Sequence, residues 1–392
     1  MPAKYIHRRI FSPLKDFLND SRAIGIVLIA CTIISLALSN IDFARESYTH
    51  FWTAHISLSA TGPHLPHDLL AWINDGLMAV FFFLVGMEIK RELMIGELAS
   101  IQKSMLPVLA ALGGMIVPAL IFFTFNGSTP FHHGWGIPMA TDIAFSLGII
   151  SLLGNRVPVQ LKIFLTALAI IDDLGAIVVI AVFYATDMHF GYLFFGLGIM
   201  IIPVILNLLK VQRMIFYFIP AIIVWYCFLN SGVHPTIAGV LLAFCIPLSR
   251  ISSLEHALYH VVNFVIMPLF ALANTAIVFP SAFGHIIHSP ITFGIVLGLV
   301  LGKPIGICIF SFLSVKLKIA SLPSDTHWKQ ILGAGMIAGI GFTMSIFIAT
   351  LAYKEEELQV ISKIAIIVGS VISGVAGYYF LNLFSRKYKN KI

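Results

Sequence analysis

Charged residues are scarce in this chain. Only 11% of its 392 residues are Asp, Glu, Lys or Arg, whereas 59% are hydrophobic and the mean hydropathy is +0.96. Soluble domains carry about 25% charged residues, so this composition excludes an ordinary soluble enzyme or nucleic-acid-binding domain. The net charge of +6 does not indicate a nucleic-acid partner, because the basic residues lie in short segments between apolar runs.

Cysteine is also scarce. The four cysteines lie in apolar runs without CxxC spacing: Cys31, Cys227, Cys245 and Cys308. This pattern excludes a zinc ribbon or a thioredoxin-like redox motif and favours unpaired packing residues. The first apolar run ends in LALSN, which has no clear small-x-small cleavage site. We therefore expect it to be a retained membrane span.

Long apolar runs make up most of the chain. A membrane-spanning helix needs about 20 mostly apolar residues. We therefore predict an all-α polytopic membrane protein with about twelve transmembrane helices. The expected spans are 22–40, 69–88, 105–125, 134–153, 159–184, 190–209, 214–230, 232–248, 256–279, 290–315, 329–353 and 359–384.

The basic residues predict the orientation of these spans. Most of the 24 Lys and Arg residues flank the even-numbered connections and the two termini. Arg45, Lys354 and Lys363 lie on the opposite side. Since basic loops remain in the cytoplasm, both termini are expected there. Residues 1–21 combine an apolar helical face with basic residues, which indicates a cytoplasmic amphipathic segment or a frayed basic tail.

Four charged side chains lie deep within the predicted spans: Asp142, Asp172, Asp173 and Lys303. A carboxylate at the centre of a membrane helix costs about 2.5–3.5 kcal/mol to insert. A structural ion pair between Lys303 and one aspartate leaves surplus acids, which must take up protons or a cation. Adjacent helical residues point about 100° apart. One of Asp172 and Asp173 is therefore expected to face Lys303 and the other a cavity, in an order that the sequence leaves open.

Two spans contain residues that interrupt helices. Residues 134–148 (GWGIPMATDIAFSLG) carry Pro138 and three glycines, and residues 333–345 (GAGMIAGIGFTMS) carry four glycines. Unwound backbone at membrane depth is tolerated only where it is buried in protein or lines a wet cavity. Paired interruptions are typical of inverted-repeat transporters, here spans 3–5 and 10–12. For span 11 alone, close glycine packing is the alternative. Asp142 is expected to compensate the positive half-helix N-termini and Lys303 the negative C-termini.

Titratable groups gather near the predicted cytoplasmic ends of spans 2 and 9. Glu88 and Glu92 share a helix face, and Glu255 precedes His256 and His260. Histidines at i, i+4 spacing gain charge together as the pH falls. We weigh pH sensing against interfacial anchoring for the histidines, and against a solvated cluster for the glutamates.

The first outer connection, residues 41–68, is long. Its HISLSATG stretch alternates in polarity before a Gly-Pro turn, which predicts a short β-hairpin. The outer connections also contain most of the histidines, but their spacing is not diagnostic of a metal site.

Four motifs resemble those of the NhaA-type sodium/proton antiporter family. They are ATDIAFSLG (140–148), ALAIIDDLGAI (167–177), LGKPIGI (301–307) and GIGFTMSIFIA (339–349). Two further segments agree, at 72–93 and 231–240. The motifs occur in family order over nearly the whole chain, so the resemblance is specific.

The resemblance implies an inverted-repeat core of spans 3–5 and 10–12 with discontinuous helices 4 and 11. A second bundle that includes spans 1, 2, 8 and 9 would form a homodimer interface with the outer hairpin. The chain then divides into an amphipathic N-terminus (1–21), spans 1–2 with outer loop 41–68 (22–104), core repeat one (105–184), connecting and interface spans 6–9 (185–289), and core repeat two with a basic tail (290–392).

The motifs also imply roles for individual residues. Asp172 and Asp173 would carry the cation and the proton, with Thr141 beside the transported Na⁺. Asp142 and Lys303 would compensate charge, and Lys303 would also exchange protons with Asp172.

The resemblance also implies a set of residues in pH regulation: Glu88, Glu92, His234 and Glu255. The histidine spacing adds His256 to this set. The glutamates would belong to a cytoplasmic funnel, and His234 would modulate the pH response.

The function implied is secondary active antiport, not enzymatic catalysis. The protein would export Na⁺, and also Li⁺, in electrogenic exchange for H⁺ across a bacterial cytoplasmic (inner) membrane. No cofactor and no nucleic acid are expected; the partners are the ions, the bilayer and a second copy of the chain. The alternatives are an intramembrane aspartyl protease, whose GxGD context is GIGF here, a sodium-coupled symporter and a channel.

Overall fold

The computed structural model describes residues 21–56, 65–279 and 283–385. Most of these residues are helical, and within these ranges the one β contact is an isolated antiparallel bridge between His55 and Asp68. The predicted all-α class is therefore confirmed. The predicted amphipathic segment lies outside the described residues except for its last position.

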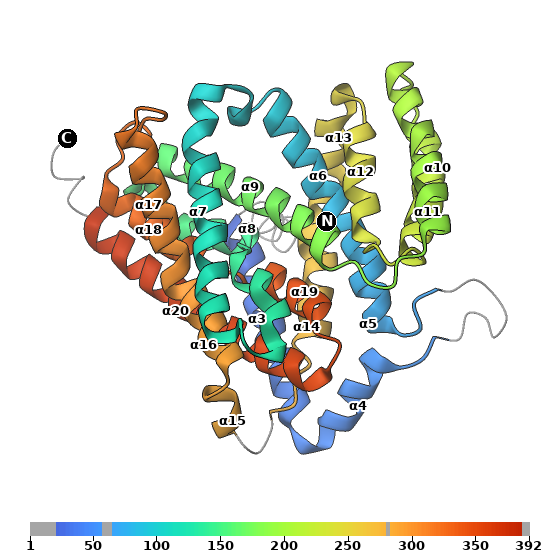
Figure 1. Cartoon of the computed structure of the whole chain (residues 1–392), viewed down its shortest axis with the longest axis horizontal. Helices are drawn as coiled ribbons and strands as arrows, with labels where there is room; N and C mark the ends of the chain where they lie inside the picture. The colour runs from blue at the N-terminus through green and yellow to red at the C-terminus, as the bar shows by residue number, and fades with distance from the viewer. Residues whose placement is uncertain (1–20, 57–64, 280–282, 386–392) are drawn as a thin grey trace, which may run out of the picture.

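The helices follow one another as drawn in Figure 1. The first are α3 (Ser21–Asn40), α4 (Asp42–Thr53), α5 (Leu69–Ala71), η2 (Trp72–Leu77), α6 (Met78–Met94), η3 (Glu97–Ala99), α7 (Ile101–Asn126), η4 (Pro130–Met139), α8 (Ile143–Leu152), η5 (Gly154–Arg156), α9 (Val159–Phe183) and α10 (Phe190–Leu208). The remainder are α11 (Ile215–Leu229), α12 (Thr236–Cys245), α13 (Leu248–Val261), η6 (Val262–Ile266), α14 (Met267–Asn274), α15 (Phe283–Ile287), α16 (Pro290–Leu297), η7 (Gly298–Gly302), α17 (Lys303–Lys316), α18 (Trp328–Ala338), α19 (Phe342–Ala352) and α20 (Glu356–Ser385).

Among the described residues, eight continuous helices are long and apolar enough to cross a membrane, and the number rises to ten if each of two bent pairs is one span. Two shorter apolar helices, α11 and α12, fall on the remaining predicted spans. Every predicted span thus coincides with helix. Length and composition support eight to ten spans, so the number twelve stays a prediction.

The two interrupted spans are broken where the sequence predicts. η4 and α8 meet at 43°, and α18 and α19 meet at 48°. The backbone leaves the helical conformation at 140–142 and 339–341. Pro138 lacks an amide donor and glycine carries a high entropic cost in a helix, so neither segment sustains a continuous ladder.

Three π-helical segments widen other spans: η2, η6 and η7. These were not predicted, because the apolar pattern around them reads as continuous helix. The segment η7 ends immediately before Lys303 and Pro304. A π turn changes the direction in which the following side chains point and often marks a functional site.

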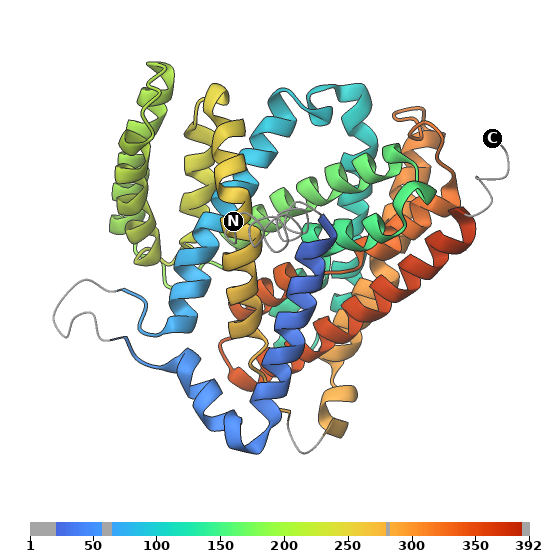
Figure 2. The ribbon, with the colours of Figure 1, turned by 180° about the vertical axis from the view of Figure 1, so that it is seen from behind.

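Two sets of helices lie on opposite sides of the molecule in both views (Figures 1 and 2). α10, α11 and α12 form one side, and α7, α17 and α18 form the other, with α9 crossing between them. α9 packs against α6, α7, α8 and α18. Gly113 of α7 and Gly306 of α17 let these helices touch, since a Cβ on either glycine would lie 2.3 or 2.1 Å from the other's carbonyl oxygen.

The outer connection 41–68 differs from the expected loop. Asp42–Thr53 forms α4, a helix whose polarity concealed it in a search for apolar runs. The Ile56 amide donates to the His67 carbonyl at 2.9 Å, next to the His55–Asp68 bridge. The tip of the predicted hairpin lies outside the described residues.

Candidate functional site

Asp172 and Lys303 form an ion pair in the interior of the protein. Both side chains are fully buried, and Lys303 Nζ donates a hydrogen bond to Asp172 Oδ2. The Thr141 hydroxyl lies 2.7 Å from the same carboxylate oxygen and 2.8 Å from Lys303 Nζ. Of the two adjacent acids, Asp172 is therefore the one that faces the lysine.

Thr141 connects this pair to the broken helix α18–α19. Its hydroxyl oxygen lies 2.9 Å from the carbonyl oxygen of Ala338, the last residue of α18. Because the hydroxyl has one proton, it donates either to Asp172 or to Ala338 at a given moment. Thr141 therefore lies between Lys303 and the C-terminal end of α18, and compensation of that helix end by Lys303 stays a prediction.

Asp173 points to a different environment. It lines a cavity of about 180 Å³ together with Asp142 of the α8 N-terminus and Glu88 of α6. The Asp173 side chain is 1% exposed, and its Oδ1 atom has no hydrogen-bond partner among the described residues. A buried carboxylate oxygen without a donor is costly unless it binds a proton or a cation. Asp172 Oδ1 also lacks a hydrogen-bond partner among the described residues, but Asp172 does not line the cavity. Asp173 is therefore the acid of the pair that is placed to exchange ligands with the cavity.

Asp142 accepts hydrogen bonds from the N-terminal ends of two half-helices, α8 and α19. As the N-cap of α8, its Oδ1 accepts from the Phe145 amide at 2.9 Å. Its Oδ2 accepts from the Thr343 amide at 3.1 Å and from the Thr343 hydroxyl, in the first turn of α19. A carboxylate here neutralises two positive helix ends at once. The geometry matches the expected placement of Asp142, and Thr343 is an addition to the predicted set.

The two broken helices also hold each other through a reciprocal pair of hydrogen bonds. Ser146 of α8 donates to the Ile337 carbonyl of α18 at 3.2 Å, and Ser345 of α19 donates to the Ile137 carbonyl of η4 at 2.7 Å. The Asp142 amide adds a bond of 2.7 Å to the Ile340 carbonyl. Breaking the helices frees these carbonyls, and the partner helix satisfies them.

Arg91 joins the acidic residues at the end of α6. Its guanidinium lies 2.7 Å from Glu255 and 3.1 Å from Glu92. Glu88, one turn earlier on α6, lines the same cavity as Asp173. The structure thus brings three of the predicted regulatory residues together around an arginine that the sequence analysis did not single out.

The two predicted regulatory histidines lie apart from that cavity. His234 Nε2 is 3.2 Å from Asp75 and its Nδ1 is 2.8 Å from Thr236, while its ring packs edge-on against Phe347 of α19. His256 is exposed on α13. Neither is among the described residues that line the cavity. Asp75 was not predicted as a functional residue, because it lies near the predicted end of a span.

The side chains around Asp173 that can bind a cation do so through oxygen atoms. Within the described ranges, no three His, Cys, Asp or Glu side chains converge as a metal site. The cavity instead offers carboxylates with hydroxyl and amide oxygens, which are ligands for hard cations.

Comparison with known proteins shows the family to which the chain is similar. The sequence model of the family described as "Na+/H+ antiporter 1" matches residues 15–381. The Na(+)/H(+) antiporter NhaA 2 of Flavobacterium johnsoniae is 50% identical over 391 residues, which cover 98% of this chain and 95% of the relative. The Na(+)/H(+) antiporters NhaA of Flavobacterium psychrophilum and Dechloromonas aromatica are 48% and 45% identical, over 95% and 96% of this chain and 96% and 97% of the relatives.

Proposed function

The chain belongs to the Na⁺/H⁺ antiporter 1 family, and from that premise we propose that it exports Na⁺ in exchange for H⁺ across a bacterial cytoplasmic membrane. It is a transporter and not an enzyme. The observation that carries the proposal is the pair of adjacent acids in which Asp172 is bound to Lys303 while Asp173 lines the cavity.

Competition between Na⁺ and H⁺ for the Asp172–Asp173 pair couples the two fluxes. A protonated Asp173 cannot bind Na⁺ well, and a Na⁺-bound carboxylate cannot hold a proton. If the protein changes its open side only when one ligand is bound, each Na⁺ that leaves requires protons to return. Thr141 contributes a hydroxyl oxygen beside Asp172 as a further ligand.

Lys303 makes the exchange electrogenic in this proposal. A Na⁺ that binds Asp172 must displace the Lys303 ammonium, since both compete for one carboxylate. Displaced from its counter-ion, the buried lysine loses what stabilises its proton and releases it. One proton from the Lys303–Asp172 pair and one from Asp173 then leave for each Na⁺ bound, so net charge crosses the membrane. Li⁺, a smaller hard cation, is expected to use the same oxygen ligands.

Alternating access is proposed to use the two broken helices as one unit. Ser146 of η4–α8 and Ser345 of α18–α19 each donate a hydrogen bond to the other broken helix. Such a reciprocal arrangement is expected if an approximate two-fold axis relates the two broken helices. This supports inverted repeats in spans 3–5 and 10–12, and with them the twelve-span topology. Asp142 keeps the two positive helix ends together as the unit moves.

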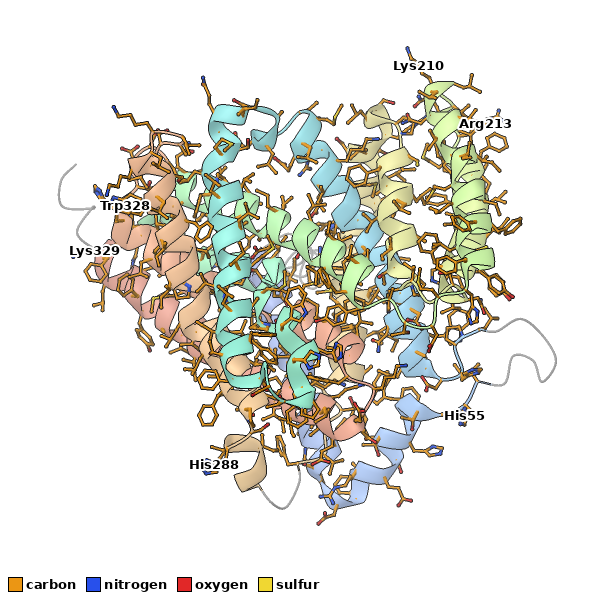
Figure 3. The ribbon with its side chains drawn as sticks, in the orientation of Figure 1. His55, Lys210, Arg213, His288, Trp328 and Lys329 are labelled. Atoms are coloured by element: carbon orange, nitrogen blue, oxygen red, sulfur yellow. The ribbon has the colours of Figure 1, made fainter. Side chains whose placement is uncertain are left out.

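Both termini are proposed to lie in the cytoplasm, and the distribution of charge supports this orientation. Figure 3 places Lys210 and Arg213 at one end of the molecule and His55 and His288 at the opposite end. The basic end is proposed to face the cytoplasm. On the outer side, α4 exposes Phe43, which supports a homodimer contact through the outer connection.

Regulation by pH is proposed for the Arg91 cluster. Glu88, Glu92 and Glu255 lie where the cavity approaches the cytoplasmic end of α6, so their protonation changes the field that an entering Na⁺ meets. His234 and Asp75 offer a second, outer pair that gains an attraction when the histidine is protonated.

Proteoliposomes with an imposed pH gradient test the proposed function. Added Na⁺ or Li⁺ should dissipate the pH gradient, whereas K⁺ should not. The rate of this dissipation should depend on the membrane potential. Counterflow of an organic solute with Na⁺ would indicate symport instead. The proposal would be contradicted if neither Na⁺ nor Li⁺ dissipated the pH gradient.

A further inference from the structure

The cavity beside Asp173 contains oxygen-bearing side chains that the transport scheme does not use. Two of them, Asn263 and Thr166, come from different helices and line the same space of about 180 Å³ as Glu88 and Asp173. Both side chains are half-buried. Neither carries a charge, so neither is expected to hold a proton.

Asn263 lies in the π-helical segment η6, between α13 and α14. An amide in an apolar helix (VVNFVIM) needs polar partners when it is buried. The Asn263 amide makes no side-chain hydrogen bond to the described part of the chain, and it lines the cavity. Since a π turn shifts which side chains face inward, η6 accounts for its place on the cavity wall.

Thr166 approaches the cavity from α9. Its hydroxyl donates to the Lys162 carbonyl at 3.0 Å, which leaves the lone pairs of its oxygen available to a cation. Thr166, Ile170 and Asp173 all line the cavity and recur at i, i+4 and i+7 on one helix face. With a rise of 1.5 Å per residue, Thr166 lies about 10 Å from Asp173 toward the start of α9.

From these placements we propose that Asn263 and Thr166 form a neutral-oxygen subsite that receives Na⁺ before Asp173. The amide carbonyl and the hydroxyl replace part of the ion's hydration shell, as carbonyl oxygens do in selectivity filters. Because both ligands are neutral, the ion is not trapped there. The unpartnered Oδ1 of Asp173 then completes the transfer. This inference deepens the proposed antiport and rests on it.

The main test is the Na⁺ dependence of proton movement in proteoliposomes of the full-length protein at fixed pH. Asn263→Ala should raise the KM for Na⁺ about five- to ten-fold, the scale of one lost polar contact to a charge. The maximal rate should stay within about twofold, because Asp172 and Asp173 are intact. Val265→Ala is the matched control: Val265 lies in the same π segment, is 50% exposed, and does not line the cavity.

Asn263→Asp separates an oxygen ligand from an amide donor. Aspartate keeps the oxygen and loses the NH₂ group. If the amide acts as a ligand, Asn263→Asp keeps the KM for Na⁺ at or below that of the unmodified protein. A KM as high as that of Asn263→Ala would mean that the NH₂ group matters, and would overturn the proposal.

Thr166 provides an independent test on another helix. Thr166→Val should raise the KM for Na⁺ and change the ratio of the Na⁺ and Li⁺ values, while Thr166→Ser should retain both. Thr124→Val is the control, since the exposed Thr124 hydroxyl bonds only its own helix at Ile121. Loss of folding would not produce a KM change that differs between two ions.

The possible results distinguish failure of the proposed subsite from failure of the proposed Na⁺/H⁺ antiport. If the unmodified protein moves no protons on addition of Na⁺, the proposed antiport fails. If it does, but Asn263→Ala and Thr166→Val keep its KM for both ions, the antiport stands and the subsite is wrong. Should Asn263→Ala not yield a monodisperse protein, Asn263→Asp and the Thr166 pair decide the question.

Discussion

Lys303 lies against Asp172 with neither side chain exposed to solvent. The relationship distinguishes two acids that are neighbours in sequence and identical in chemistry. Asp172 has a positive partner, and Asp173, one residue later, has a cavity. In the proposed transport cycle, these different environments account for the different roles of the two carboxylates.

Asp172→Asn should impair transport severely and also destabilise the protein. Removing one partner of a buried ion pair costs about 3–5 kcal/mol, because the remaining charge is left without compensation. We expect a lower melting temperature in detergent and little Na⁺-dependent proton movement. Adding Lys303→Met to Asp172→Asn should restore the melting temperature but not transport. A double variant no more stable than Asp172→Asn would show that the pair does not bear on stability.

Thr343→Val should weaken the junction of the two broken helices. The Thr343 hydroxyl donates to Asp142, and a hydrogen bond to a charged group is worth about 1.5–3 kcal/mol. The hydrogen bond from the Thr343 backbone amide to the same carboxylate remains. The variant should therefore fold, with a reduced melting temperature and slower transport. Thr350→Val in the same helix is the control, since its hydroxyl bonds only to Phe347 of its own turn. Equal effects of both substitutions would argue against a special role for Asp142.

The reciprocal serines should behave as a coupled pair. Ser345→Ala removes the shorter bond and should destabilise more than Ser146→Ala, each by about 1 kcal/mol. The double variant should deviate from the sum of the single variants, because both bonds hold the same two half-helices together. Thermal unfolding of all four proteins measures the coupling. Strict additivity would mean that the two bonds act independently.

Proton competition sets the direction of the pH dependence. As the pH rises, fewer protons compete for Asp172 and Asp173, so the KM for Na⁺ should fall by up to about tenfold per pH unit for one competing proton. The fall should end once the carboxylates are free of protons. Initial rates over a grid of Na⁺ concentration and pH measure this relation. A KM that is independent of pH across the active range would contradict direct competition.

Much of the site is predictable from sequence because charge at membrane depth is conspicuous. Asp142, Asp172, Asp173 and Lys303 stand out against apolar neighbours, and Pro138 with the glycines predicts both helix breaks. These signals depend on local composition, and the structure agrees with them. Helix existence follows from apolar length for the same reason.

Other features depend on contacts that local composition does not contain. The sequence alone could not decide which aspartate faces Lys303, since that depends on the rotation of α9 against α17. The π segment η6, which places Asn263 on the cavity wall, lies in an apolar run that reads as ordinary helix. Helix α4 was missed because its surface is polar. The hydrogen-bond partners of Ser146 and Ser345 come from segments distant in sequence, so the residues around each serine do not predict its partner.

The most direct measurement is Na⁺-induced proton movement in proteoliposomes that contain Asp173→Asn. Asparagine keeps the size of the side chain but cannot exchange a proton, so the account predicts that the movement disappears. Asp187→Asn is the control, because Asp187 is exposed just beyond the C-terminal end of α9 and its substitution should leave the movement unchanged. Full Na⁺-dependent proton movement with Asp173→Asn would contradict the account.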